Sequence, residues 1–282
     1  MVGIIKQAKR YLRAARVNLT HPSVLKERQY IFVLSHMRSY STLLTHILGS
    51  HPQISGYSEP RKGRGSYRTN LDLLKLRTLI NYHGNYKSDC SFFLDKLLHE
   101  EADISDSILR RRTAHVIFFV REPAATLRSI VAMHRKYVQE GSPRGASAIP
   151  PTAEDAFVYY QGRLRSLVDT AERLHRFSHP ALVIRADELI NTAPLLLRRI
   201  ESFLQLRTTL QECYSVFEHT GAWDYGDTSE FIRKGTIERN RPDHSEIIVS
   251  PQLLHEAHLV FDRCMGVLQG FFPAANLIPS VR

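Results

Sequence analysis

Cysteine is scarce in this sequence, and long apolar runs are absent from it. The three cysteines, Cys90, Cys213 and Cys264, are odd in number and widely spaced, so they indicate neither a disulfide framework nor a zinc site. No apolar run approaches the roughly 20 residues that cross a bilayer. The N-terminus also lacks the apolar centre of a signal peptide. These features favour a cytoplasmic protein with reduced thiols.

Acidic residues are outnumbered by basic ones. The chain of 282 residues has 38 Lys+Arg against 28 Asp+Glu, a net charge of +10, and 43% of its residues are hydrophobic. This composition suits one large core, and no linker divides the chain, so we expect a single domain over residues 1–282. A basic balance favours anionic partners. The basic residues are dispersed and form no nucleic-acid-binding motif, so we expect a polyanionic small ligand and no nucleic acid.

The first residues carry a basic helical pattern. Residues 1–18 hold five lysines and arginines among apolar side chains at helical spacing, which predicts a basic amphipathic helix. Two interpretations stay open. The helix lies on an anionic membrane surface, as a peripheral contact, or it docks on the rest of the domain.

A strand, a polar turn and a helix follow one another early in the chain. Residues 30–34 are an apolar run typical of a buried strand, and residues 41–48 have the spacing of a helix that ends at Gly49. A helix N-terminus offers unpaired N–H groups and the positive end of the helix dipole, so it suits an anion. The turn adds one cation and three hydroxyl groups: Arg38, Ser39, Ser41 and Thr42.

Glycine and lysine are both missing from this turn. The phosphate-binding loop of nucleotide kinases reads Gly-x4-Gly-Lys-[Ser/Thr], so a Walker-type NTPase is not expected. A hydroxyl-rich helix start is also an ordinary cap. Taken alone, the turn leaves a cap and a ligand site equally open.

The wider pattern resembles a known family. Arg38-Ser39-x-Ser41-Thr42-Leu43-Leu44, followed by His51-Pro52 and Glu59-Pro60, is similar to the 5′-phosphosulfate loop of sulfotransferases that use 3′-phosphoadenosine 5′-phosphosulfate (PAPS). It is most similar to the carbohydrate, tyrosyl-protein and bacterial branches, and we expect a soluble, bacterial-type protein. The resemblance implies an α/β fold, a P-loop-like three-layer sandwich with a central, mainly parallel sheet flanked by helices. Tyr40 stands where the family has glycine, and its side chain either changes the backbone angle or lies beside the ligand.

A second motif follows a second strand. Residues 115–120 are strongly apolar, as in a central parallel strand, and they lead to Arg121 and to a helix at 124–137 that begins after a proline. Members of the family bind the 3′-phosphate with an arginine at a strand end and a serine eight positions later. Arg121 and Ser129 match this pattern. The planar guanidinium suits phosphate because it meets two oxygens at a time.

A third resemblance lies late in the chain, at residues 224–237. In the family a basic triplet with glycine closes over the 3′-phosphate there, and Arg233, Lys234 and Gly235 are the matching positions. A glycine N–H approaches phosphate closely. Ala186 stands where cytosolic relatives have a tyrosine beside the adenine, so that contact is absent or is supplied by another residue.

The resemblance implies in-line transfer of a sulfuryl group from PAPS to an acceptor hydroxyl, without a metal, leaving 3′,5′-phosphoadenosine. Arg38 and the turn at 39–42, Tyr40 included, would hold the 5′-phosphosulfate, and the other two motifs would hold the 3′-phosphate. Glu59 is the expected general base and His99 the second candidate, with Lys96 also facing the acceptor. Alternatively, Glu59 pairs with Arg61 or Lys62 on the surface.

Two other functions remain open. The first is a catalytically inactive, sulfotransferase-like binding protein for an anionic ligand, in which Tyr40 blocks the donor. The second is a kinase that binds ATP with magnesium. The acceptor is not indicated, and carbohydrate, lipid, peptide tyrosine and small molecule are all compatible. Nothing indicates the oligomeric state. The remaining expected elements are strands at 91–94 and 181–184, helices at 71–82, 104–112, 153–177, 194–206 and 251–268, and loops at 60–70 and 141–151.

Overall fold

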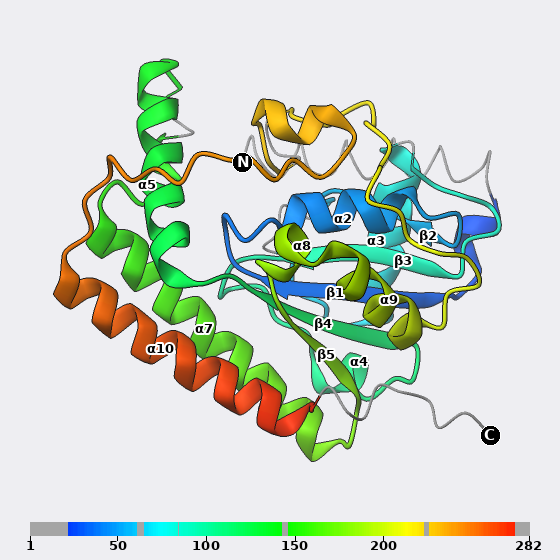
Figure 1. The fold of residues 1–282 in the computed structure, drawn as a ribbon. Helices are drawn as coiled ribbons and strands as arrows, with labels where there is room; N and C mark the ends of the chain where they lie inside the picture. Colours follow the sequence, from blue (N-terminus) through cyan, green and yellow to red (C-terminus); the bar gives the residue numbers. More distant parts are fainter. Residues whose placement is uncertain (1–21, 61–64, 84, 143–145, 223–225, 274–282) are drawn as a thin grey trace, which may run out of the picture.

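A five-stranded, all-parallel sheet forms the centre of the molecule in a computed structural model (Figure 1). The structure describes residues 22–60, 65–83, 85–142, 146–222 and 226–273, so the basic helix expected at 1–18 lies outside the described residues. The strand order is β2-β3-β1-β4-β5. The strands are β1 (Gln29–Ser35), β2 (Ile54–Ser55), β3 (Phe92–Leu97), β4 (Ala114–Val120) and β5 (Ala181–Arg185).

Helices cover both faces of the sheet, which gives three layers (Figure 1). Alternate residues of the strands enter two separate apolar clusters, because successive side chains of a strand point to opposite faces. One face packs on α2 (Ser41–Ser50), α8 (Glu188–Asn191) and α9 (Ala193–Leu204). The other face packs on α3 (Asn70–Tyr82), α4 (Asp106–Leu109), α5 (Pro123–Gln139), α7 (Ala153–Arg176) and α10 (Pro251–Phe271).

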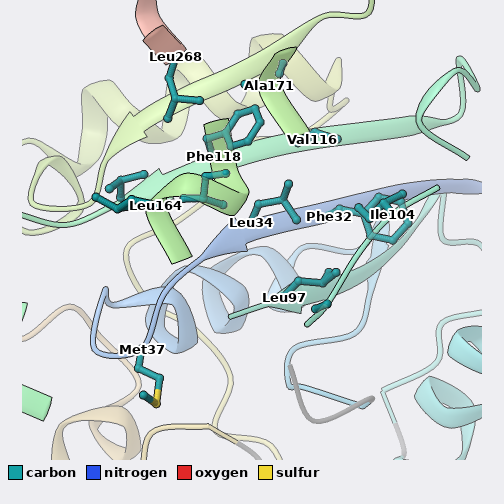
Figure 2. Close-up of a cluster of buried hydrophobic side chains, with 14 of the residues drawn as sticks. Phe32, Leu34, Met37, Leu97, Ile104, Val116, Phe118, Leu164, Ala171 and Leu268 are labelled. Carbon is teal, nitrogen blue, oxygen red and sulfur yellow. The ribbon is translucent and has the colours of Figure 1, made fainter. Parts of the chain in front are cut away.

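The larger cluster joins the middle strands to the long helices. Phe32 and Phe118 from neighbouring strands belong to one cluster with Leu164 of α7 and Leu268 of α10, and all four side chains are at most 1% exposed (Figure 2). Burial of each such side chain stabilises the fold by roughly 1.5–3 kcal/mol. This packing fixes α7 against the sheet, and α7 in turn supports the site described below.

The register aligns the carboxyl ends of three strands. Leu34 of β1 pairs with Leu97 of β3, and Ser35 pairs with Phe119 of β4. β2 and β3 lie on one side of β1, and the later strands β4 and β5 lie on the other side. The order in which strands are added to the sheet therefore reverses at β1. In open parallel sheets, ligands bind in the crevice outside the strand ends at such a reversal point.

The expected α/β fold with a parallel central sheet is confirmed, with three local differences. The strand expected at 91–94 continues to Leu97, because its charged residues are paired inside the protein: Tyr67 Oη donates to Asp95, and Lys96 contacts Glu59 and Thr42. The helix expected at 104–112 is only α4, because the backbone at Ile104 pairs with Tyr67 instead. The two-residue β2 was not expected.

Two short 3₁₀ helices complete the described elements, η1 (Pro22–Leu25) and η2 (Glu230–Lys234). Among the described residues, none of the helices combines the length and the apolar character that a membrane crossing requires.

Candidate functional site

A cavity of about 620 Å³ opens where β1, β3 and β4 end. It brings together most residues that the sequence singled out. Its wall includes the whole turn from Arg38 to Thr42 and both base candidates, Glu59 and His99. Arg121 and Ser129 from the second motif line the same cavity. The two arginines therefore share one crevice.

The backbone of the turn is held in an uncommon conformation. Arg38 and Tyr40 both have left-handed backbone angles, with φ of 62° and 65°. Such angles disfavour residues with a Cβ atom and cluster at functional sites. Tyr40 is the N-cap of α2 but makes no side-chain cap hydrogen bond to it. The first residues of α2, Ser41 to Leu43, line the cavity, and the first N–H groups of a helix have no partner within the helix, so this end of α2 suits an anion.

Ser39 takes a structural position inside the turn. Its Oγ is fully buried and lies 2.7 Å from the carbonyl oxygen of His36 and 2.6 Å from Oγ of Ser35. The Ser39 hydroxyl thus fastens the turn to the end of β1. Ser41 and Thr42 are the hydroxyl residues at the start of α2 that remain on the cavity wall.

Arg38 lines the cavity and contacts two distant parts of the chain. Its Nε donates to Oγ of Ser129 at 2.9 Å, and its Nη1 lies 3.2 Å from Oδ1 of Asp227. The Ser129 side chain belongs to α5, and Asp227 belongs to the segment before η2. The sequence did not indicate Asp227.

The side chain of Arg121 contacts the turn through the backbone carbonyl of Arg38 and the side chain of Tyr40. Its Nη1 donates to the carbonyl oxygen of Arg38 at 3.0 Å, and its Nη2 donates to Oη of Tyr40. The guanidinium carbon lies 4.0 Å from the centre of the Tyr40 ring, a cation–π distance. Nε lies 3.5 Å from Oδ1 of Asp187, an ion-pair distance without hydrogen-bond geometry. Tyr40 therefore lies beside the cavity and orders Arg121.

A neutral histidine joins the two strand ends. Nε2 of His36 accepts the N–H of Arg121 at 3.0 Å, and Nδ1 lies 2.9 Å from the carbonyl oxygen of Met37, so Nδ1 carries the proton. Complete burial lowers the pKa of His36 to about 3. The ring stays uncharged at neutral pH and keeps Arg121 at a fixed place relative to the turn.

Glu59 forms a buried pair with a lysine of β3. Nζ of Lys96 lies 2.9 Å from Oε1 of Glu59 and donates to Oγ1 of Thr42 at 2.7 Å. The Lys96 side chain is fully buried and that of Glu59 is 11% exposed. Lys96 thus connects the expected base to the helix that holds the expected phosphate. Arg61 and Lys62, the alternative partners of Glu59, lie outside the described residues.

Three side chains of α7 form hydrogen bonds with backbone groups at and just after the ends of β1, β3 and β4. Tyr159 Oη accepts from the N–H of Met37 at 2.8 Å and donates to the carbonyl of Leu98 at 2.7 Å. Tyr160 Oη donates to the carbonyl of Arg121 at 2.8 Å. Arg163, which is 2% exposed, donates to the carbonyls of Ser35, Leu97 and His99 at 2.7, 2.8 and 3.1 Å.

The residues of the third motif lie outside the cavity lining. Arg233 donates to the carbonyl of Gly221 at 3.4 Å, and Lys234 pairs with Glu238. Gly235 has a left-handed φ of 70°, and its carbonyl accepts from Tyr214. Arg241, six residues further on, does line the cavity. Its guanidinium carbon lies 5.2 Å from the centre of the Tyr40 ring, and its buried Nη2 has no hydrogen-bond partner among the described residues.

Arg241 and Asp227 are the site residues that sequence reasoning missed. Arg241 belongs to a short basic stretch, Arg239-Asn240-Arg241, which is a signal of the kind used for the earlier motifs. Asp227 left no signal, because only the folded chain brings it to Arg38. Within the described ranges, no group of three or more His, Cys, Asp or Glu side chains is placed to hold a metal.

The fold is similar to that of a sulfotransferase domain from the curacin biosynthetic pathway. The TM-score is 0.56 at 19% sequence identity, over 85% of this chain and 98% of that domain. A sulfotransferase domain from the Synechococcus PCC 7002 olefin synthase aligns with a TM-score of 0.49 and 18% identity, over 84% of this chain and 95% of that one. No protein-family model and no curated protein matches the sequence. The first likeness shows a sulfotransferase fold, and the chemistry of the site depends on the residues described above.

Proposed function

We propose that this protein is a PAPS-dependent sulfotransferase that acts on a hydroxyl group. The observation that carries the proposal is the shared cavity of Arg38 and Arg121, which lie at neighbouring strand ends beside the N-terminus of α2. Two cationic groups and a helix N-terminus in one cavity suit one molecule that carries two phosphate groups. The fold and the net charge of +10 support the same assignment.

The two ends of the donor are assigned to different residues. Arg38, Thr42 and the N–H groups at the start of α2 bind the 5′-phosphosulfate. Arg121 and Ser129 bind the 3′-phosphate, and Arg241 supplies a further cation on that wall. The third motif receives no direct contact with the donor, because the contacts of Arg233, Lys234 and Gly235 lie outside the cavity lining. We assign these residues to supporting the loop that carries Arg241.

The reaction forms one bond and breaks one bond at sulfur. The acceptor oxygen attacks the sulfur in line as the bond from sulfur to the bridging phosphate oxygen breaks, and 3′,5′-phosphoadenosine leaves. Negative charge that develops on the leaving oxygens is stabilised by Arg38 and the α2 N–H groups. Glu59 accepts the proton of the acceptor hydroxyl. No metal is assigned a role, since these cationic groups stabilise the same charge.

Lys96 places Glu59 for this role. It holds one carboxylate oxygen at 2.9 Å and the Thr42 hydroxyl at 2.7 Å, so the base and the phosphate-binding helix keep a constant separation. Positioned general bases contribute roughly 10²–10⁴-fold to rate. His99 lines the same cavity and is the second candidate for the base.

Mass spectrometry tests the transfer. The purified protein is incubated with PAPS carrying heavy sulfur and with extracts or pooled hydroxyl compounds. The proposal predicts an acceptor that gains one labelled sulfuryl group, with one 3′,5′-phosphoadenosine released for each group transferred. Release of the nucleotide without any labelled acceptor, or no release at all, would contradict it. Boiled protein is the control.

The close contact of Tyr40 with Arg121 favours one competing function. The ring and hydroxyl of Tyr40 occupy a large part of the Arg121 side chain, as expected if the chain binds an anionic ligand without turnover. This alternative predicts binding of 3′,5′-phosphoadenosine without product. A kinase instead predicts that ATP with magnesium raises the melting temperature more than 3′,5′-phosphoadenosine does. A thermal-shift comparison therefore separates the kinase from the other two functions, and product formation separates those two from each other.

A further inference from the structure

The phosphate-binding turn is occupied by a carboxylate of the same chain. Oδ1 of Asp227 lies 3.2 Å from Nη1 of Arg38, and the backbone N–H of Asp227 donates to Oγ1 of Thr42 at 3.1 Å. Arg38 and Thr42 are two of the groups that the proposed function assigns to the 5′-phosphosulfate. An acid therefore stands where an anionic ligand would make its contacts.

Neighbouring residues hold this carboxylate in place. The N–H and Oγ of Ser229 donate to its two oxygens at 3.0 and 2.9 Å. Gly226, with a φ of 108°, packs tightly against the start of α2: a Cβ atom there would lie 2.7 Å from Oγ1 of Thr42 and 3.1 Å from Nζ of Lys96. Only a residue without a side chain lets the segment approach this closely. The segment 226–229 is therefore built to dock on the turn.

The carboxylate is charged at any physiological pH. Burial by itself raises the pKa of Asp227, but the charge of Arg38 and the hydrogen bonds from Ser229 outweigh burial and lower this pKa to about 2. Asp227 thus places one negatively charged oxygen, Oδ1, on Arg38, as a phosphate or a sulfate would. A phosphate and this carboxylate would repel each other if both lay on Arg38.

We propose that Asp227 is an internal competitor for the anion that Arg38 binds, and that a phosphate group binds there only by displacing it. The proposal rests on the proposed function for the identity of the nucleotide, but the competition itself applies to any phosphate on Arg38. Displacement costs the same for every ligand that occupies Arg38. It costs nothing for a ligand that uses only Arg121 and Ser129. Asp227 therefore determines which phosphate of the donor binds weakly.

Calorimetry with Asp227→Asn tests the competition. The ligands are 3′,5′-phosphoadenosine, adenosine 5′-phosphate, inorganic pyrophosphate and adenosine 3′-phosphate. The first three bind the variant about tenfold more tightly than the unmodified protein, a gain equal to about 1.4 kcal/mol. Adenosine 3′-phosphate binds both proteins equally. Asp262→Asn, which removes a charge from the exposed side of α10, is the matched control and leaves all four affinities unchanged.

A second variant reaches the same outcome by another route. Gly226→Ala forces the segment away from Thr42, so it also raises affinity for the three ligands, and its melting temperature shows whether the fold is kept. If neither variant gains affinity for any phosphate ligand, the competition is wrong, whatever the protein binds. If pyrophosphate gains affinity while no adenosine ligand binds either protein, the competition stands and the proposed nucleotide is wrong.

Discussion

The two arginines of the cavity are held in different ways. Arg121 is fixed by parts of the chain that cannot leave: the carbonyl of Arg38 accepts from its side chain, and His36 accepts its backbone N–H. Arg38 is held by two side chains that can turn away, Asp227 and Ser129. The side chain of Arg121 is 10% exposed and that of Arg38 is 24% exposed. Arg121 is therefore ordered mainly by backbone groups and the Tyr40 hydroxyl, whereas Arg38 is held by a carboxylate that an anionic ligand must replace.

This difference has a physical consequence for binding. A group that is already ordered loses little conformational entropy when its ligand arrives, and the ligand keeps most of the contact energy. A group that must release a carboxylate loses part of that energy. We therefore expect Arg121 to supply more of the nucleotide affinity than Arg38 does, and Arg38 to act in addition on the charge that develops during transfer.

Replacing the proposed base should lower turnover without changing the nucleotide affinity that the two arginines supply. Glu59→Gln keeps the size and the hydrogen-bonding ability of the side chain but removes its basicity. Turnover falls by about 10²–10⁴-fold. The dissociation constant of 3′,5′-phosphoadenosine changes by no more than about twofold. Initial rates and calorimetry measure the two quantities, with His99→Gln as the matched comparison. Full activity of Glu59→Gln would exclude Glu59 as the base.

Removing the fixed arginine sharpens the comparison most directly. Arg121→Ala weakens 3′,5′-phosphoadenosine by roughly 1.5–3 kcal/mol, the size of a charged hydrogen bond. Adenosine 5′-phosphate, which lacks the 3′-phosphate, loses far less. Calorimetry with both ligands checks the difference, and Arg233→Ala, outside the cavity lining, is the control. Equal losses for both ligands would show that Arg121 does not bind the 3′-phosphate.

Acid should loosen the connection between the two arginines. The pKa of His36 is lowered to about 3 from its ordinary 6.5, so between these values the unfolded chain binds a proton that the folded chain refuses. The stability from the neutral ring is fully present above about pH 6.5 and is lost as the pH falls towards 3. His46 and His115, whose pKa values burial lowers to about 4, contribute in the same direction.

Chemical denaturation at several pH values measures this loss. His36→Gln reduces the slope of unfolding free energy against pH by at most about 1.4 kcal/mol per pH unit between pH 6 and 4. His258→Gln, on the exposed side of α10, is the control variant. Identical slopes for both variants would mean that His36 is not held neutral in the folded protein.

We expect the smallest change in nucleotide affinity from Tyr160 of α7. Tyr160→Phe removes only the hydroxyl that donates to the carbonyl of Arg121. We expect a loss of about 0.5–1.5 kcal/mol in affinity for 3′,5′-phosphoadenosine, the net size of one hydrogen bond. Affinity for adenosine 5′-phosphate stays unchanged, which a loss of general stability would not produce. The same measurement on Tyr30→Phe, whose hydroxyl lies elsewhere in the core, is the control.

Much of the fold could be predicted from local patterns in the sequence. Apolar runs and helical spacing predicted β1, β4, α5 and α10 within a few residues, because each of these elements buries one continuous set of side chains. β3 ended later than predicted, since charged residues inside a strand are acceptable only when distant partners pair with them. Those partners, such as Glu59 for Lys96, cannot be read from the strand itself.

The site divides along the same line. Arg38, Arg121 and Ser129 each belong to a short motif next to a strand end, so the sequence could place them together. Asp227 enters the cavity through a loop that is nearly 190 residues beyond Arg38, as their sequence separation of 189 shows. Arg241 comes in by the same loop. Which loop residue faces a cavity depends on the tertiary path of the chain, and a single sequence contains no signal for that path.

The central claim is that two arginines in one cavity bind the two phosphates of one adenosine molecule. Calorimetric titration of the unmodified protein with 3′,5′-phosphoadenosine, and with each of its two monophosphate analogues, tests it directly. We predict that the bisphosphate binds at least about tenfold more tightly than either monophosphate, because both arginines contribute. A bisphosphate that binds no more tightly than the better monophosphate would contradict the claim.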